Sequence, residues 1–335
     1  MNDVVAQGGG TLRVPPGDYD FAMRKVIDLG GAAVEITGHG KGVSVLRCNN
    51  ADGIWWFSNS SAESALSVRR LTMAPNRGGN AGTALRVDNP ALSTDPDRCS
   101  LEMHSVDFQP TDSLVDYFQV HVRGAYLKHA RFDDVFIRGV RGSGWEAGWK
   151  LAEYGFDLSN GDGAAFVNCY SKNNQYGFWL SKYRGAVVFD RCNGVQNHTG
   201  MRVNALAEET CTVDVLHCHI NTFVRNLKII SVDRLSVLEL ASYVQNEIPN
   251  PDTFKDIVVR DCTDVSILGC AFNQPFALNR VQIDLIGSTQ GVLIKGNVFN
   301  GPYWDGTGNT TTVDMDTSVS DVEETQNLYP PEPQW

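Results

Sequence analysis

Residues 164–169 read Ala-Ala-Phe-Val-Asn-Cys, residues 187–192 read Val-Val-Phe-Asp-Arg-Cys and residues 213–218 read Val-Asp-Val-Leu-His-Cys. Each segment places apolar residues at its first and third positions and a cysteine at its sixth. The same spacing, with Cys, Leu, Val or Asn in the last place, recurs in the segments 43–48, 66–71, 101–106, 130–135, 235–240, 265–270 and 292–297. The last members lie between 22 residues (Cys218 to Leu240) and 35 residues (Leu71 to Val106) apart. A repeat of this length indicates stacked supersecondary units.

The alternation of apolar and polar positions has a period of two, which is typical of a half-buried β-strand. A second alternating pair precedes the pattern in most repeats, for example Phe178 and Leu180 before segment 187–192. Asparagine or glycine stands where the chain must turn, as at Asn173, and these residues tolerate left-handed backbone conformations. Several short strands per repeat, without helical periodicity, predict an all-β solenoid of about ten coils, a parallel β-helix. The coils should stack roughly 4.8 Å apart, the spacing between strands.

The cysteines fit this pattern as buried residues. Five of the eight occupy the sixth position of a repeat and should point inward: Cys48, Cys169, Cys192, Cys218 and Cys270. A free cysteine behaves there as a small hydrophobic residue. Cys169 and Cys192 should lie on adjacent parallel strands facing a crowded core, so we expect no disulfide between them. Eight cysteines in 335 residues do not form a disulfide scaffold, and we expect folding in a reducing compartment.

The composition limits the partners. The net charge is −11 and the isoelectric point is near 5.1, which disfavours nucleic acid and anionic membranes as partners. No apolar run reaches the length of a membrane span. Residues 1–6 lack the basic and apolar regions of a secretory signal peptide. We therefore expect no nucleic-acid partner, no membrane insertion and no secretion signal.

The repeats assign most of the chain to one solenoid. We predict a cap segment at residues 1–33, the β-helix at residues 34–300 and an extended acidic tail at residues 301–335, which contain seven acids and no Lys or Arg. His217-Cys218-His219 is not predicted as a metal site, because alternate residues of a strand point to opposite faces and cannot bind one ion. We expect no metal and no cofactor.

Residues 6–21, Ala-Gln-Gly-Gly-Gly-Thr-Leu-Arg-Val-Pro-Pro-Gly-Asp-Tyr-Asp-Phe, resemble the N-terminal part of the pectate-lyase-like β-helices of phage tailspikes. In that family a capping helix runs into a strand of the form Gly-Gly-Gly-x-Val/Leu-x-Val-Pro-x-Gly-x-Tyr. The resemblance implies a single-stranded right-handed parallel β-helix over nearly the whole chain. It also implies a carbohydrate ligand, a homotrimer and a place in a phage tail. The family includes polysaccharide lyases, glycoside hydrolases, acetyl esterases and non-catalytic adhesins, so the fold does not choose the chemistry.

Function should lie on the outer surface, because side chains fill the interior of a β-helix. The residue between the two apolar members of the first strand should point outward, and successive members should be neighbours. In chain order these residues are Glu35, Arg86, His121, Asp157, Trp179, Arg202, Lys228, Val258 and Asp284. An aromatic ring stacks on a sugar, and charged groups bind its hydroxyls or carboxylates. We therefore predict His121, Trp179, Arg202 and Lys228 to bind substrate and Asp157 to be catalytic; an ordinary solvated sheet face is the alternative.

The loops that follow this strand should occupy one corner of three successive coils. They would bring Asp162, Tyr183, Arg184, Glu208 and Glu209 close together and close to the catalytic candidate of the preceding strand. Glycosidases use two carboxyl groups about 5–5.5 or 6.5–9.5 Å apart, and neighbouring coils provide spacings of that order. We predict Asp162, Glu208 and Glu209 as catalytic candidates and Tyr183 and Arg184 as substrate-binding residues. Acids on ordinary solvated loops are the alternative.

One coil is longer than the next because of residues 139–153, a glycine-rich stretch. It carries Trp145, Glu146 and Trp149. We predict that this loop forms a wall of the substrate site, with the two tryptophans binding substrate and Glu146 as a further catalytic candidate. A loop that contacts a neighbouring subunit is the alternative.

These features predict a phage tailspike-type protein that binds and depolymerises a bacterial surface polysaccharide. Hydrolysis would use the carboxylates named above. Elimination from a uronic acid would use Arg184, Arg202 or Lys228 to bind the carboxylate, with His121 or Tyr183 as the base. The alternative is a non-catalytic tail adhesin or baseplate protein. In either case we expect a homotrimer in the virion, made in the host cytoplasm and in contact with other tail proteins.

Overall fold

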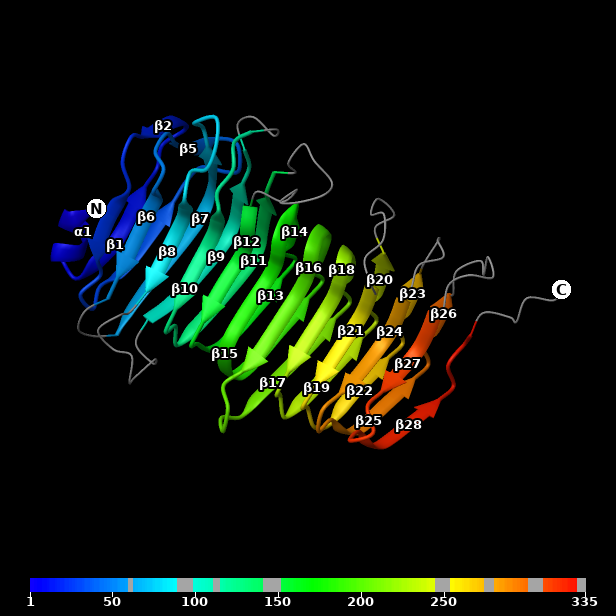
Figure 1. Cartoon of the computed structure of the whole chain (residues 1–335). Helices are drawn as coiled ribbons and strands as arrows, with labels where there is room; N and C mark the ends of the chain where they lie inside the picture. The colour runs from blue at the N-terminus through cyan, green and yellow to red at the C-terminus, as the bar shows by residue number, and fades with distance from the viewer. Residues whose placement is uncertain are drawn as a thin grey trace.

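The chain forms one long right-handed parallel β-helix (Figure 1). The computed structural model describes residues 1–59, 63–88, 99–110, 115–140, 152–244, 254–273, 280–300 and 310–329. A short helix, α1 (Asn2–Ala6), lies at one end of the rod and the last strand, β28, lies at the other. Each turn of the chain contributes strands to three faces, which we call faces A, B and C.

Every strand between the first and last coils pairs in parallel with strands of the coils before and after it. Face A consists of β3 (Lys25–Asp28), β6 (Gly53–Ser58), β8 (Thr83–Asp88), β10 (Val120–Ala125), β12 (Ala152–Ser159), the first part of β15 (Asn174–Asp190), the second parts of β16 (Asn193–Ala205) and β18 (His219–Ile230), β21 (Phe254–Arg260), β24 (Arg280–Ile286) and β27 (Thr310–Met315). Face B consists of β1 (Gly9–Arg13), β4 (Ala33–Thr37), the first parts of β7 (Ser64–Pro75), β9 (Cys99–Phe108) and β11 (His129–Arg138), β13 (Asp162–Val167), the second part of β15, β17 (Cys211–Leu216), β19 (Arg234–Leu238), β22 (Val265–Leu268), β25 (Gln290–Lys295) and β28 (Ser320–Thr325). Face C consists of β2 (Gly17–Phe21), β5 (Ser44–Cys48), the second parts of β7, β9 and β11, β14 (Tyr170–Lys172), the first parts of β16 and β18, β20 (Ala241–Val244), β23 (Ala271–Asn273) and β26 (Val298–Asn300).

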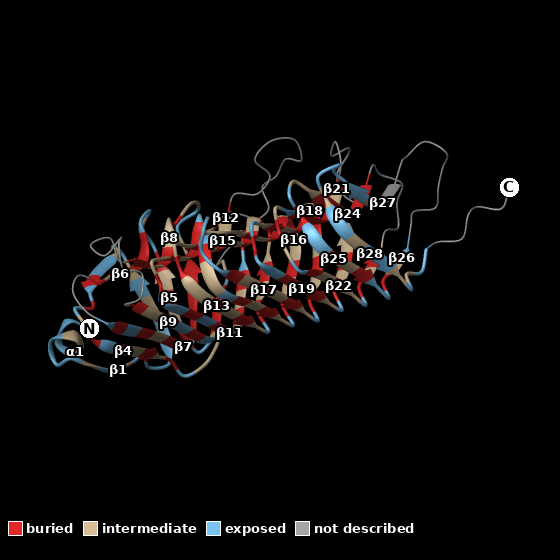
Figure 2. Ribbon diagram, turned by 90° about the horizontal axis from the view of Figure 1, so that it is seen from below, coloured by how far each residue is buried: buried red, intermediate tan, exposed pale blue. Residues whose placement is uncertain are grey.

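The repeated apolar pair forms the inner side of face B. Its members are in register from Leu66 and Val68 to Val292 and Ile294, and they are buried. This confirms the predicted register over those coils. Buried and less buried residues alternate along the strands for most of the rod (Figure 2), as expected for strands with one face toward a core.

The sixth position of each repeat begins face C. The residue just before it adopts a left-handed conformation, with φ between 52° and 54°, in the successive coils at Arg70, Ser105, Asp134, Asn168, Arg191, His217 and Glu239. A single left-handed residue turns the chain sharply, so the next side chain again points inward. Such residues cost roughly 1–2 kcal/mol each when they are not glycine, and the packing of the sixth side chain offsets that cost.

The predicted cysteine stack is present. Cys169, Cys192 and Cys218 are buried in consecutive coils, and the Cys192 thiol lies beside the other two. Burial raises the pKa of the Cys192 thiol, with the neighbouring thiols adding to the effect. All eight cysteines are buried and free of disulfides.

Two predictions about the ends of the solenoid were wrong. The segment 43–48 is not a face B repeat: it forms β5 on face C, where Ser44, Leu46 and Cys48 point inward and Val43 is 45% exposed. The pairing also extends beyond residues 34–300. Strands β1, β2 and β3 already pair with β4, β5 and β6, and β27 and β28 pair with β24 and β25.

A buried polar network lies inside the C-terminal part of the rod. Asp256 on β21 and Arg280 on β24 are fully buried, and the Arg280 Nε donates to Asp256 Oδ2 at 2.5 Å. The other carboxylate oxygen accepts from Ser242 Oγ and from Asn226 Nδ2. The buried carboxylate is thus surrounded by donors, which buried charges require.

Candidate functional site

The outward residues of face A form a mixed charged and aromatic column. Parallel pairing places Arg123, Asp157, Trp179, Arg202 and Lys228 side by side on β10, β12, β15, β16 and β18. Four of these residues were predicted. Neighbours in such a column lie roughly 4.8 Å apart, so the column runs along the rod axis.

A second outward column, which the sequence analysis missed, runs beside the first. It consists of Tyr154, Tyr176, Arg225 and Lys255, which are partly exposed, and of Thr199, which is buried among them. The signal is visible in the sequence: residues 154–158 read Tyr-Gly-Phe-Asp-Leu and residues 176–180 read Tyr-Gly-Phe-Trp-Leu. The glycine of each motif is buried between coils.

Gly177 shows why the motif needs glycine. A Cβ at this position would lie 2.6 Å from the carbonyl oxygen of Gly200 in the next coil, closer than any side chain allows. The chain passes close to its neighbour here. The residues before and after the Gly177-Phe178 pair, Tyr176 and Trp179, consequently both reach the outer surface, where they contact each other.

Tyr154, Tyr176 and Trp179 form one aromatic cluster. The two tyrosine rings stack at 5.2 Å with an interplanar angle of 18°. The Trp179 ring meets Tyr176 at 4.4 Å and Tyr154 at 5.7 Å, both edge-to-face. All three rings remain partly exposed. Burial raises the pKa of Tyr154 to about 12, with the nearby Glu153 and Asp157 adding to the effect, so this hydroxyl stays protonated at neutral pH.

Arg202 extends the cluster into the next coil. Its guanidinium lies 4.0 Å from the centre of the Trp179 ring, and its Nε donates to Asn204 Oδ1 at 3.3 Å. A cation over an indole ring is attracted by the negative face of the ring. The two contacts hold the guanidinium on the outer surface in a fixed orientation.

Asp157 is tied to Arg123. The Arg123 Nε donates to Asp157 Oδ2 at 2.7 Å, and the aspartate side chain is 18% exposed. Burial raises the pKa of Asp157; Arg123 opposes this shift and Glu153 adds to it. Arg123 and Glu153 are thus part of the site, although neither was predicted as a site residue.

The prediction of His121 as an outward substrate-binding residue was wrong. His121 is buried, its Nδ1 donates to the carbonyl oxygen of Tyr154 at 3.1 Å, and its ring meets Phe108 and Phe118 edge-to-face at 5.8 Å. Arg123 occupies the place in the column that was predicted for His121, next to Asp157. Burial lowers the pKa of His121 to about 4.

We expect His121 to make the fold acid-sensitive. The unfolded chain binds the imidazole proton near the ordinary pKa of 6.5, whereas the folded chain binds it near pH 4. The free energy of unfolding should therefore be at its full value above pH 6.5 and fall as the pH drops toward 4. At 1.36 kcal/mol per pKa unit the loss approaches roughly 3 kcal/mol. Urea denaturation at pH 7 and pH 4.5 measures it.

The matched variants for this prediction are His121→Gln and His104→Gln. The first removes the buried titrating group, so its loss of stability on acidification should be smaller than that of the unmodified protein. The second removes a half-exposed histidine and should leave the pH dependence as it is. An equal loss in His121→Gln and the unmodified protein would contradict the prediction.

The prediction of Tyr183 as a substrate-binding residue and base was also wrong. Its side chain is fully buried, and burial raises its pKa further above the ordinary value of 10. The ring fills the space beside Gly161 of the preceding coil, where a Cβ would lie 2.5 Å from the tyrosine Cζ. Tyr183 is therefore a core residue that complements a glycine.

The predicted corner is only partly assembled. Arg184 lies 3.9 Å from Asp162 and 4.0 Å from Glu209, so these three charges meet. Glu208 is exposed in a left-handed turn with φ of 68°. The ion-pair partner of Asp157 is Arg123 on face A rather than a corner residue. The other predicted residues, Trp145, Glu146 and Trp149, lie outside the described residues.

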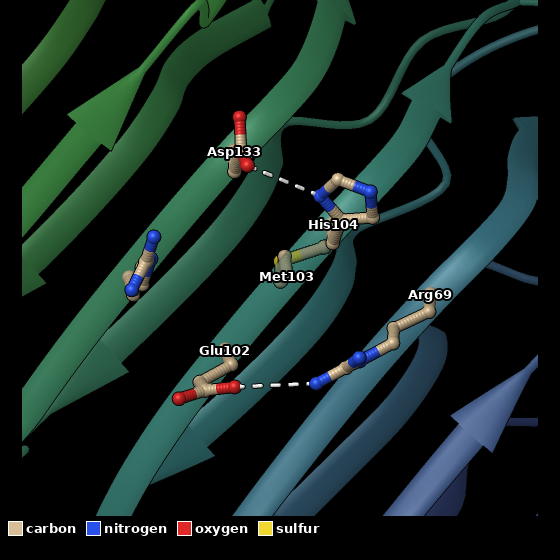
Figure 3. A pocket seen from close by; sticks show the side chains of 6 residues that line it. Arg69, Glu102, Met103, His104 and Asp133 are labelled. Carbon is tan, nitrogen blue, oxygen red and sulfur yellow. Dashed lines mark hydrogen bonds and ion pairs between the residues drawn. The ribbon is translucent and has the colours of Figure 1, made fainter. Parts of the chain in front are cut away.

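A charged groove lies on face B, over β7, β9 and β11 (Figure 3). Its volume is about 260 Å³, and an adjoining hollow of about 420 Å³ extends it over β1 and β4. Arg69 lies between Glu35 at 3.6 Å and Glu102 at 3.5 Å. His104 lies 3.3 Å from Asp133. The sequence analysis placed Glu35 in the face A column, but it belongs to this groove.

The face B groove and the outer surface of face A differ in ion pairing and in aromatic content. In the face B groove, the carboxylates that line it pair with a base of the same groove, and its described lining contains no aromatic ring other than His104. Face A combines an aromatic cluster with cations. Face A therefore offers the better surface for a sugar ligand.

Other classes of site find little support in the described part of the chain. It contains no group of three or more His, Cys, Asp or Glu residues arranged to hold a metal ion. None of its helices has the length and apolarity needed to span a membrane.

The fold is similar to that of several solved structures, among them the following three. The surface protein and adhesin PfbA of Streptococcus pneumoniae aligns with a TM-score of 0.50 and 11% identity, over 96% of this chain and 94% of that chain. The A-module of the mannuronan C-5 epimerase AlgE6 of Azotobacter vinelandii aligns with a TM-score of 0.42 and 13% identity, over 99% and 90%. ORF18 of Geobacillus virus E2 aligns with a TM-score of 0.41 and 11% identity, over 93% of this chain but 54% of that chain. No protein-family model and no curated protein sequence matches the chain.

Proposed function

We propose that this protein is a phage tailspike-type protein that binds a bacterial surface polysaccharide along the outer surface of face A. The observation that carries the proposal is the partly exposed cluster of Tyr154, Tyr176 and Trp179, with Arg202 held at 4.0 Å over the indole. Sugar rings stack their C–H faces on aromatic rings, and their hydroxyls bind polar groups at the ring edge. The columns follow the rod axis, which suits an extended polymer.

Replacing Trp179 by alanine should weaken polysaccharide binding about tenfold. Loss of one stacked ring removes roughly 0.5–1.5 kcal/mol beyond the buried area, and about 1.4 kcal/mol corresponds to tenfold in Kd. Binding is measured on an array of purified bacterial capsular and O-antigen polysaccharides. Far-ultraviolet circular dichroism should remain unchanged, because the side chain points outward.

Tyr170→Ala is the matched control for the loss of an outward aromatic ring. Tyr170 lies on face C, where its ring stacks on Phe136 at 4.6 Å, so its removal should leave the affinity unchanged. If Trp179→Ala binds every polymer of the array as tightly as the unmodified protein does, face A is not the binding surface.

Asp157 favours hydrolysis as a second activity. A general acid needs a raised pKa, and burial shifts the pKa of Asp157 in that direction, with the neighbouring Glu153 as the second carboxylate. New reducing ends from the bound polymer, lost in Asp157→Asn, test this activity. Without them, the protein is the non-catalytic adhesin of the alternative hypothesis. Elimination has less support, because both predicted bases, His121 and Tyr183, are buried.

The tailspike assignment draws on residues 6–21. They fold as the end of α1 followed by β1 and β2, and the family resemblance implies a capping helix that runs into a strand. We extend the proposal to a homotrimer in the phage tail, in contact with other tail proteins. An outward column of Leu216, Leu238 and Leu268 on face B supplies an apolar surface suited to subunit contact. Light scattering of the purified protein tests the subunit number.

A further inference from the structure

Three cations gather next to the aromatic cluster on face A. Arg202 and Lys228 are paired neighbours on β16 and β18, and Arg225 lies three residues before Lys228 on β18. All three side chains are partly exposed on the outer surface. We call Arg202, Arg225 and Lys228 the cationic cluster.

Ion pairing distinguishes the cationic cluster from the neighbouring basic residues. Within the described part of the chain, no aspartate or glutamate forms an ion pair with any of the three, whereas the adjacent cations are paired: Lys255 with Asp284 at 2.5 Å and Arg260 with Asp261 at 3.2 Å. The chain as a whole carries 39 acidic and 28 basic residues. Because acidic residues outnumber basic ones, three neighbouring basic residues without an ion pair among the described residues differ from what the composition predicts.

The cations oppose one another's charge. Burial lowers the pKa of Lys228, and Arg225, Arg202, Arg260 and Lys255 lower it further. Burial likewise lowers the pKa of Arg202, and Arg225 contributes in the same direction. Like charges held together in this way are destabilising unless an anion lies between them. A bound anion would relieve the repulsion and gain charge-assisted hydrogen bonds from guanidinium groups.

We infer that the cationic cluster binds the anionic groups of the polysaccharide, so that the ligand of face A is an acidic rather than a neutral polymer. The inference rests on the proposed function. The aromatic cluster would hold the sugar rings, and the cationic cluster, on the next two coils, would hold the carboxylates or phosphates that the sugars carry. Lys228 and Arg225 would then recognise the negative charge of the polymer, and Tyr176 and Trp179 would recognise its sugar rings.

The test uses the full chain and the same polysaccharide array. We expect the polymers that bind to be acidic. Each polymer that binds is then compared with its carboxyl-reduced and its dephosphorylated forms, which identifies the anionic group. Removal of that group should weaken binding at least about tenfold, the effect of losing a hydrogen bond to a charged partner. Arg225→Gln and Lys228→Gln should each weaken binding of the acidic polymer about tenfold and binding of its neutral form very little.

Lys295→Gln is the control for net charge. Lys295 is exposed on β25 of face B, so this substitution removes one positive charge elsewhere and should leave the affinity unchanged. If the bound polymers are neutral, or bind as well after carboxyl reduction and dephosphorylation, the inference is overturned while the proposed function stands. If no polymer of the array binds, both fail. If a single-stranded oligonucleotide binds as tightly as the acidic polymer, the cluster recognises nucleic-acid phosphate and the inference is also overturned.

Discussion

Replacing Phe189 by alanine is expected to lower the free energy of unfolding by about 3–5 kcal/mol, the usual cost of deleting a buried aromatic ring. Phe189 is fully buried, stacks on Phe166 at 4.9 Å and meets Phe178 edge-to-face at 5.6 Å. Phe166 stacks in turn on Phe132 of the preceding coil. The cavity would therefore form at the end of a stack that links three coils. Denaturation in guanidinium chloride, followed by circular dichroism, measures the change.

Val188→Ala is the matched control. Val188 precedes Phe189 on β15 but points outward, so its truncation should cost about 1 kcal/mol or less. Equal losses in the two variants would mean that the inward and outward sides of face B are wrongly assigned at this strand, because only an inward ring leaves a cavity.

Replacing Asp256 by leucine should be comparably destabilising, by about 3–5 kcal/mol. The substitution removes the carboxylate that accepts from Arg280, while that guanidinium remains fully buried. Breaking a buried ion pair from one side leaves the remaining charge without its counterion in a medium of low polarity. Asn226 and Ser242 lose an acceptor at the same time.

The double variant Asp256→Leu/Arg280→Met separates the two contributions. Replacing a whole buried ion pair by apolar residues of similar size is often close to neutral, so the double variant should be more stable than Asp256→Leu. The difference between the double variant and the sum of the single variants gives the interaction energy. A loss below about 1 kcal/mol in Asp256→Leu would show that the buried charge is compensated elsewhere.

The sequence predicted face B well because its inward residues are large and apolar in nearly every coil. It failed at β5, where a serine, Ser44, takes an inward place and the apolar Val43 points outward. It failed again at β10. The inward residues there are Val122 and Gly124, and glycine carries no hydrophobic side chain to mark its position. The sequence analysis therefore took Val120 and Val122 as the inward pair, which placed His121 between them on the outer surface.

The candidate site was predictable in part for a related reason. Asp157, Trp179, Arg202 and Lys228 stand between two apolar residues and were found from alternation alone. Tyr154, Tyr176 and Arg225 were missed because two consecutive buried residues follow each of them, which breaks the period of two. The pairing between Arg123 and Asp157 depends on the correct register of β10, so it could not be found once that register was shifted.

The eight buried thiols can report where along the rod the structure opens. They are free and lie at intervals from Cys48 on β5 to Cys270, just after β22. A thiol reagent can reach a buried cysteine only when the surrounding coil opens. Because each coil of a solenoid contacts only its neighbours, the labelled positions after a short pulse distinguish fraying from the ends from opening of the whole rod at once. Mapping the labelled cysteines by mass spectrometry would thus show which coils open together, with no residue added to the chain.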